Sequence, residues 1–250
     1  MGIFALIQLN FVSFAAPLAA LAIMERRGTS DRHLAATLAM VFAMGQANVF
    51  YPLTPFGLHW GAAIGISLIG GLAASSFTYY LAGRKLSSAT LRDEEGELAQ
   101  EKPRAGLIAV INGAGADAIR LSLGSLPMLL LSLTVVGILK AAGVVEALTS
   151  LLTPLMSFFH ISTVYVLLTL TKCLAGGTAY FGVASEMAQH GQLTAAQINA
   201  SAGFLVQTLD LPGIGIFLGI ASRFVRLFRF ALAGAIVGIL LRTLLHALLF

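Results

Sequence analysis

Two charged side chains interrupt long apolar segments of this sequence. Lys172 lies within TKCLAGGTAY (171–180), and Asp210 lies within TLDLPGIGIF (208–217). If these segments cross a membrane, an isolated charge at the centre costs at least about 2.5–3.5 kcal/mol on insertion scales, so we expect the two opposite charges to compensate each other. A glycine or proline follows each charge within about one helical turn and interrupts the helix there. Paired interruptions of this kind predict a substrate site near the middle of the membrane.

Polar residues beside the two interruptions complete the predicted site. Their amide and hydroxyl groups suit hydrogen bonding to a neutral polar solute. We predict substrate binding by Lys172, Thr178, Asp210, Gln207, Asn48 and Gln46, with helix breaks lining the site at Gly176, Gly177, Pro212 and Gly213. Two alternatives stay open. Asp210 beside unwound carbonyls could hold a coupling ion, a proton or sodium, or the charge pair could fix helix packing and bind nothing.

Other chemistries find no support in the sequence. The single cysteine, Cys173, cannot form an internal disulfide, and the histidines are too far apart in sequence to predict a metal site or a catalytic triad. The glycine-rich NGAGADA (112–118) lacks the lysine and the strand context of a phosphate-binding loop. Arg242, in the last apolar run, is expected to snorkel to a surface or to pack inside. We therefore expect no enzyme, no resident cofactor and no metal.

The composition identifies the class of protein that must position these residues. Of the 250 residues, 58% are hydrophobic and 10% are charged, and the mean hydropathy is +0.89, which is typical of an all-α, polytopic membrane protein. The first apolar run lacks the basic region of a signal peptide, so we expect it to be retained. Apolar runs predict about eight spans, some of them broken or re-entrant, at 3–24, 34–52, 59–82, 123–142, 144–159, 162–186, 198–221 and 230–249.

Two of these spans carry further local predictions. Segment 144–159 is short for a span and could re-enter the membrane instead of crossing it. The sequence TAAQ (194–197) fits a capping box, in which a threonine side chain and a glutamine three residues later satisfy the first backbone N–H groups of a helix. We expect this capping box to begin the seventh span.

The basic residues cluster in three connections, at 25–33, 84–104 and 222–229. With eight spans all three connections fall on one side of the membrane, and the positive-inside rule makes that side cytoplasmic. The net charge of +4 thus has an origin in topology and anionic lipid headgroups, so we expect no nucleic-acid partner.

The charged segment 84–104 also divides the sequence into a three-helix transmembrane part, 1–83, and a longer transmembrane part, 105–250. Its acidic and basic residues balance, which is typical of a solvated linker. After it, residues 105–128 carry apolar side chains at roughly helical spacing, interrupted by Asn112, Asp117 and Arg120. We predict an interfacial amphipathic helix there, with the two charges three residues apart partly neutralising each other.

Small residues recur at four-residue spacing in three places. Gly57, Gly61 and Gly65 form one stripe, and pairs at Gly215/Gly219 and Gly234/Gly238 repeat the spacing. Such stripes let membrane helices approach closely, so we predict helix contacts and no chemistry at these positions.

Three stretches resemble the nucleoside-recognition, or Gate, domain family of membrane proteins, particularly its YjiH-like branch. They are NGAGADAIRLSLGSLPMLLLSLTVVGILKAAGVVEALTSLLTPL (112–155), TKCLAGGTAYFGV (171–183) and SAGFLVQTLDLPGIGIF (201–217), and the resemblance extends over about residues 105–250. It implies functional roles for Asn112, Gly113, Asp117 and Arg120 in the amphipathic helix, and for Lys172, Gly176, Gly177, Thr178, Asp210, Pro212 and Gly213 around the breaks.

The resemblance implies an integral transporter in the bacterial inner membrane. Such a protein would carry a small polar solute, such as a nucleoside, by alternating access around the broken helices. The similar ferrous-iron transporters have a GTPase domain and the concentrative nucleoside transporters have more helices, so this chain is expected to work as a homo-oligomer or with a second membrane subunit. The alternative from another class is a non-transporting membrane scaffold or assembly subunit, in which the charge pair is structural.

Overall fold

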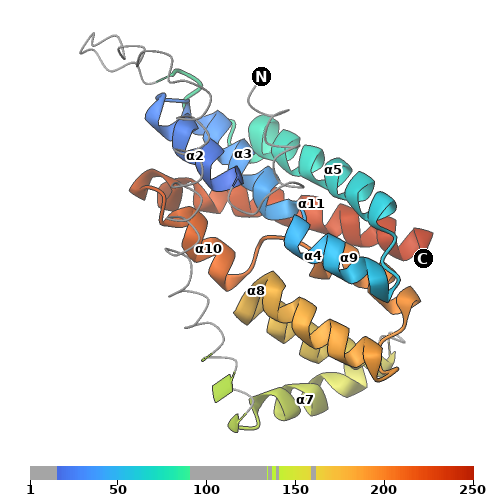
Figure 1. Ribbon diagram of the computed structural model, residues 1–250. Coiled ribbons are helices and arrows are strands. Elements are labelled where there is room, and N and C mark those ends of the chain that lie inside the picture. The colour runs from blue at the N-terminus through green and yellow to red at the C-terminus, as the bar shows by residue number, and fades with distance from the viewer. Residues whose placement is uncertain (1–15, 91–133, 135–136, 139–140, 159–161) are drawn as a thin grey trace, which may run out of the picture.

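The computed structural model describes residues 16–90, 134, 137–138, 141–158 and 162–250, and every regular element in these ranges is a helix. Four segments are long and apolar enough to cross a membrane: Asp31–Phe56, Trp60–Ala82, Val164–Gln189 and Ser222–Leu249. The prediction of an all-helical membrane protein is therefore confirmed. The elements are α2 (Ala16–Arg26), α3 (Asp31–Ala43), α4 (Ala47–Leu53), η1 (Thr54–Phe56), α5 (Trp60–Phe77), η2 (Thr78–Ala82), α7 (Val144–Phe158), α8 (Val164–Gln189), α9 (Ala195–Leu205), α10 (Leu211–Leu218) and α11 (Ser222–Leu249) (Figure 1).

Several predicted segments fall partly or wholly outside the described residues. These are the beginning of the span 3–24, most of the span 123–142, residues 91–104 of the linker, and the amphipathic helix with Asn112, Gly113, Asp117 and Arg120. The short predicted span 144–159 corresponds to α7, which has 15 residues.

Two helical units with opposite directions form the centre of the bundle. In the first unit α3 is interrupted at residues 44–46, continues as α4, and is followed by α5. In the second unit α9 is interrupted at residues 206–210, continues as α10, and is followed by α11. Helix α11 lies against α3, α5 and α9, so helices from both sides of the linker pack into one bundle (Figure 1).

The basic connections lie together at one end of this bundle, which we call the basic end. Arg223, at the start of α11, donates to the Asp31 carboxylate at 2.6 Å and to the Thr29 carbonyl at 2.6 Å. Arg32 donates its side chain to the Tyr79 carbonyl at 2.7 Å, and its backbone N–H lies 3.1 Å from the Ser87 carbonyl. Helices α3 and α11 therefore both begin at the basic end, and the residues that follow α5, at least as far as Ser87, also lie there.

Two of the predicted loops are shorter than expected. Residues 222–229 form the first turns of α11, and the connection predicted at 25–33 is reduced to the residues between Arg26 and Asp31. Arginine has a high helix propensity, so a basic cluster marks the side of a membrane without ending a helix.

Helix α9 begins at the opposite end of the bundle. Asn199, in its second turn, accepts a hydrogen bond from the His59 N–H at 2.8 Å and donates to the Gly57 carbonyl at 2.8 Å. Gly57, with a φ of 96°, makes the turn between α4 and α5. The broken helices α3–α4 and α9–α10 thus run in opposite directions, and so do α5 and α11. This is the geometry of an inverted repeat.

The predicted capping box begins α9. The Thr194 side chain accepts from the Gln197 N–H at 3.2 Å, and the Gln197 side chain accepts from the Thr194 N–H at 2.9 Å. Helix α9 therefore starts at Ala195, three residues before the predicted span 198–221, and it ends at Leu205, so that span consists of two short helices.

One glycine stripe holds the two units together. A Cβ added at Gly234 would overlap the Thr78 hydroxyl, and one at Gly238 would overlap the Gly70 carbonyl. Helix α11 can approach α5 this closely only because these positions lack side chains, as the spacing predicts. In the other stripe, an added Cβ at Gly57 would overlap Ala195, whereas Gly61 and Gly65 have no atoms within 4 Å of an added Cβ among the described residues.

Candidate functional site

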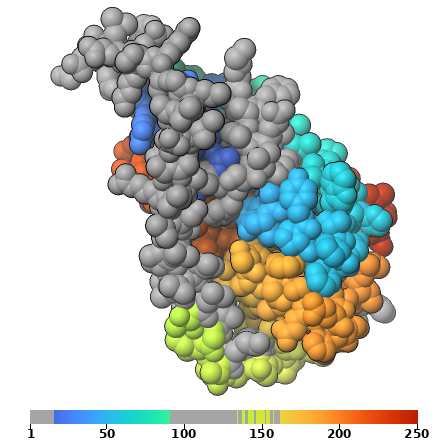
Figure 2. Space-filling view, in the orientation of Figure 1, coloured from blue at the N-terminus to red at the C-terminus, as the bar shows by residue number. Residues whose placement is uncertain are grey.

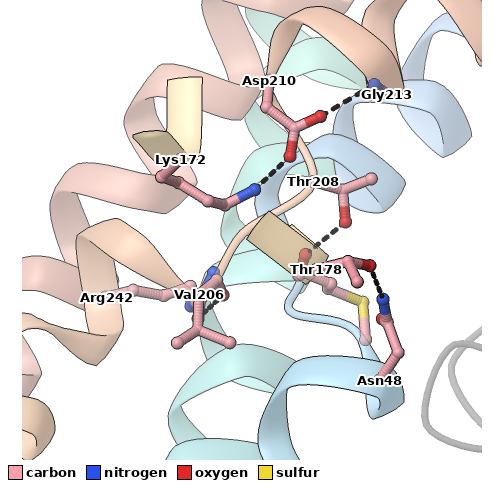
Figure 3. A network of polar contacts seen from close by, with 9 residues as sticks. Asn48, Lys172, Thr178, Val206, Thr208, Asp210, Gly213 and Arg242 are labelled. Carbon is pink, nitrogen blue, oxygen red and sulfur yellow. Dashed lines mark hydrogen bonds and ion pairs between the residues drawn. The ribbon is translucent and has the colours of Figure 1, made fainter. Parts of the chain in front are cut away.

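The breaks in the two inverted units meet in the interior of the bundle. Residues 44–46 separate α3 from α4, and residues 206–210 separate α9 from α10. The Thr208 N–H donates to the Phe42 carbonyl at 3.1 Å, and the Thr208 hydroxyl donates to the Met44 carbonyl at 2.8 Å. Each break thereby supplies partners for backbone groups that the other leaves unpaired, as backbone at membrane depth requires (Figure 3).

A third break lies in α8, at Gly176. Its φ of 85° and ψ of −175° are not helical, and glycine adopts this backbone readily because it has no Cβ. The two halves of α8 turn back against each other (Figure 1). Tyr165, in the first turn, packs against the same apolar cluster that contains Tyr180, although a straight helix would separate these residues by about 22 Å. The segment predicted as the span 162–186 is therefore a hairpin whose tip is at Gly176.

The buried ion pair predicted from the sequence forms between the tip of this hairpin and the start of α10. The Lys172 ammonium donates to Oδ2 of Asp210, and the two side chains are 1% and 4% exposed. The partner oxygen, Oδ1, accepts from the Gly213 N–H at 2.8 Å (Figure 3). Both carboxylate oxygens and the ammonium thus have protein partners, and the pair is electrically neutral as a unit.

Asp210 has a second role as the N-cap of α10. Its backbone is extended, with φ −132° and ψ 167°, and its side chain accepts from the third residue after it. Aspartate is a favoured N-cap because its carboxylate satisfies one of the first N–H groups of the helix. The sequence placed the break at Pro212 and Gly213, which is wrong. Both lie in the first turn of α10, where proline is well tolerated because its missing N–H would have no helical partner.

A cavity of about 160 Å³ opens beside the ion pair. Its polar groups come from α4, the α8 hairpin and the start of α10, which brings together eight of the residues predicted from the sequence. The cavity is lined by Gln46, Asn48, Ala175, Gly176, Gly177, Thr178, Asp210, Pro212, Gly213 and Ile216.

The cavity has an open side and a buried side. Asn48 and Thr178 are exposed, and the Asn48 amide donates to the Thr178 hydroxyl at 3.3 Å. They lie where α4 meets the second half of α8, along a seam visible on the molecular surface (Figure 2). Gln46 and Asp210, each 5% exposed, form the buried side. The Gln46 amide lines the cavity from this buried side, where it can contact a bound molecule.

Gln207 is not among the residues that line the cavity. It is buried, at 4% exposed, in the break between α9 and α10, and its Oε1 has no hydrogen-bond partner among the described residues. Lys172 also lies outside the lining and acts on the cavity through Asp210. The predicted residues Asn112, Asp117 and Arg120 lie outside the described residues.

Sequence reasoning missed the importance of Arg242. This α11 residue is 0% exposed, and its guanidinium donates to the Ala43 carbonyl, to the Val206 carbonyl at 2.6 Å and to the Ala202 carbonyl at 3.4 Å. These carbonyls end α3 and α9, where the last turn of a helix leaves acceptors unpaired and negative. A single cation thus closes the C-terminal ends of both broken helices, and Figure 3 shows its position beside Val206. The available signal was its position, alone in an apolar run.

The described residues contain no cluster of three or more histidine, cysteine, aspartate or glutamate side chains that could hold a metal ion. The polar groups of the cavity are amides, a hydroxyl and a neutralised carboxylate, which suit reversible hydrogen bonding to a solute. Comparison with known protein families, with curated proteins and with solved structures finds no match for this chain. Its function therefore has to be inferred from the site.

Proposed function

We propose that this protein is an integral membrane transporter of a small polar solute, of the Gate type. The observation that carries this proposal is the meeting of three helix breaks beside a buried, neutralised ion pair and a cavity lined by two side-chain amides. Irregular backbone at membrane depth is tolerated where protein or a polar cavity satisfies it, and transporters place their substrate sites there.

The inverted arrangement of the two units supports alternating access. Units that run in opposite directions through a membrane can exchange conformations, so that rocking one against the other opens a central site first to one side and then to the other. Here the exchange would take place where the breaks at 44–46 and 206–210 cross, next to the cavity.

The residues of the site have distinct roles in this proposal. Gln46, Asn48 and Thr178 bind the solute by hydrogen bonds, while Lys172 and Asp210 hold the hairpin tip against the start of α10. A coupling proton or sodium ion at Asp210 would have to displace the Lys172 ammonium, because both carboxylate oxygens already accept hydrogen bonds. Release of Lys172 would then couple the ion to movement of the hairpin.

We further propose an inner-membrane location with the basic end in the cytoplasm. The positive-inside rule supports this orientation, since the three basic connections gather at that end. The same proposal includes the predicted set of about eight membrane segments, some of them broken or re-entrant, in which the α8 hairpin is a re-entrant segment. It also includes assembly with a second copy or a second membrane subunit, since Gly61 and Gly65 on α5 have no described atoms within 4 Å of an added Cβ and would let another helix approach closely.

The test is solute-dependent stability of the purified protein in detergent, followed by uptake into proteoliposomes. A solute that binds only the folded state raises the melting temperature once its concentration exceeds its dissociation constant. Nucleosides, nucleobases, amino acids and cations would be compared on the wild type, on Asp210→Asn and on a control, Ser185→Ala, which changes a half-buried serine outside the cavity. We expect one solute class to shift the wild type and the control but not Asp210→Asn.

A membrane scaffold is the second candidate, because the Lys172–Asp210 pair is complete without any ligand. In that case Asp210→Asn would melt lower, no solute would shift any variant, and a stoichiometric membrane partner would co-purify. That set of results would replace the transporter proposal with the scaffold.

A further inference from the structure

The size of the cavity limits what it can enclose. Its volume is about 160 Å³, and an engineered apolar cavity of about 150 Å³ in another protein encloses one benzene molecule. A single six-membered ring therefore fills the space between the α8 hairpin and the break at 44–46. A nucleoside adds a sugar ring of similar size, which would have to remain outside the cavity.

The chemistry of the lining limits the ligand further. The ion pair leaves the cavity without net charge, so a charged ligand would lose its hydration without gaining a counter-ion. Gln46 presents an acceptor and a donor side by side on one planar amide. That pair matches a ligand edge that carries an adjacent N–H and C=O, as a glutamine does when it reads a nucleobase edge.

Glycine lets the hairpin tip lie close to this amide. An added Cβ at Gly177 would overlap Val49 at 2.7 Å and would lie 3.4 Å from Oε1 of Gln46. Gln46 and the hairpin tip therefore line the same part of the cavity, and Asn48 and Thr178, which lie on its open side, can contact the outer edge of a bound ring.

We infer that the cavity binds one neutral, planar, six-membered cyclic amide, whose N–H and C=O edge is recognised by Gln46, and that it does not enclose a nucleoside. The inference rests on the proposed function, since it names the substrate class of the same site. It also narrows the class implied by the family resemblance, from nucleosides to molecules of the size of a nucleobase.

Four probes separate the elements of this inference in the purified full-length protein. Uracil has the ring and the amide edge, 1,3-dimethyluracil has the ring with both N–H groups blocked, benzoate has a ring of the same size with a charge, and uridine has the edge and a sugar. We expect uracil alone to raise the melting temperature and to bind in equilibrium dialysis. This comparison needs no variant and so does not depend on any substitution folding.

Two buried glutamines provide a matched pair of variants. Gln46→Leu removes the amide that lines the cavity, whereas Gln207→Leu removes one that is equally buried but lies outside the lining. We expect uracil to bind Gln46→Leu at least roughly ten-fold more weakly than it binds the wild type, and to bind Gln207→Leu as it binds the wild type. Melting temperatures without ligand establish that both variants are folded.

The outcomes distinguish this inference from the proposed function. Uridine binding as tightly as uracil would overturn the size limit, and equal binding of 1,3-dimethyluracil or of Gln46→Leu would overturn recognition of the amide edge. Uptake of a different solute class, blocked by Asp210→Asn, would overturn the inference and leave the transporter standing. If no solute in the wider screen binds or is taken up, both are wrong.

Discussion

Replacing Arg242 tests whether one buried cation closes both broken helices. In Arg242→Met a shorter, unbranched side chain of similar volume retains the apolar packing of the arginine stem but donates no hydrogen bonds. The carbonyls of Ala43 and Val206, at the ends of α3 and α9, would lose their side-chain donor in the interior of the bundle. The substitution therefore changes hydrogen bonding at the helix crossing more than it changes volume.

The size of the effect follows from two opposing contributions. A buried acceptor left without a donor costs about 1–3 kcal/mol, so two of them cost about 2–6 kcal/mol. Removing a buried cation relieves part of its desolvation penalty, which acts in the opposite direction. The partly negative ends of two helices already offset much of the charge of the guanidinium in the folded state. We therefore expect a net loss of about 2 kcal/mol in the free energy of unfolding.

Denaturant titration in detergent micelles, followed by circular dichroism, measures this loss. Arg226→Met is the matched control, because Arg226 lies on the same helix and is exposed. Arg242→Lys should fall between the wild type and Arg242→Met, since an ammonium keeps the charge but cannot span carbonyls on two helices. If Arg242→Met unfolds at the same denaturant concentration as Arg226→Met, the guanidinium does not hold the two helix ends and our account of the crossing is wrong.

Three further predictions concern other parts of the fold, each measured by the same titration. Gly238→Ala drives a methyl group into the backbone of α5 and should lower the free energy of unfolding by about 1–3 kcal/mol. The control, Gly65→Ala, has no atoms within 4 Å of the added Cβ among the described residues and should change this free energy by less than about 0.5 kcal/mol. Equal effects of the two variants would exclude close packing as the cause. Lys172→Met and Asp210→Asn should each lower the free energy of unfolding by about 3–5 kcal/mol, because each leaves one buried partner uncompensated. The double variant should lose less than the sum of the two single losses. Additive losses would show that the two side chains do not interact. Thr194→Ala removes the capping box of α9 and should cost about 1 kcal/mol, with Thr194→Ser retaining most of the stability; a serine variant as weak as alanine would exclude the cap.

The sequence by itself identified the class of protein and several local features. Long apolar runs predict membrane helices because crossing a bilayer requires about 20 such residues in succession, a local property of the chain. The capping box at Thr194 and the close approach at Gly238 were predictable for the same reason, since each depends on residues a few positions apart. The glycine pair at 176 and 177 predicted a break in the helix near Gly176, but nothing in the sequence predicted that the chain reverses direction there.

Other features depended on which segments meet. The break at residues 44–46 has only a weak signal, a glycine and a glutamine in an apolar run, and it is stable because Thr208, more than 160 residues away in sequence, bonds to the Met44 carbonyl. Gln207 and Asn48 looked equivalent as neighbours of breaks, yet only Asn48 lines the cavity. Which of the two amides reaches the cavity is decided by how the hairpin, α4 and the break at 206–210 pack together.

The position of the Arg242 side chain cannot be predicted from its neighbours in sequence. Its sequence neighbours are apolar, so hydropathy cannot distinguish a guanidinium that snorkels to a membrane surface from one that is buried inside the bundle. The choice is decided by the open ends of α3 and α9, which exist only where two inverted units cross. The composition predicts the class of the protein, and short stretches of sequence predict the position of most helices. The partners of a buried charge, and hence the site, are fixed by contacts between distant segments, because a buried polar group must find its hydrogen bonds wherever the tertiary structure supplies them.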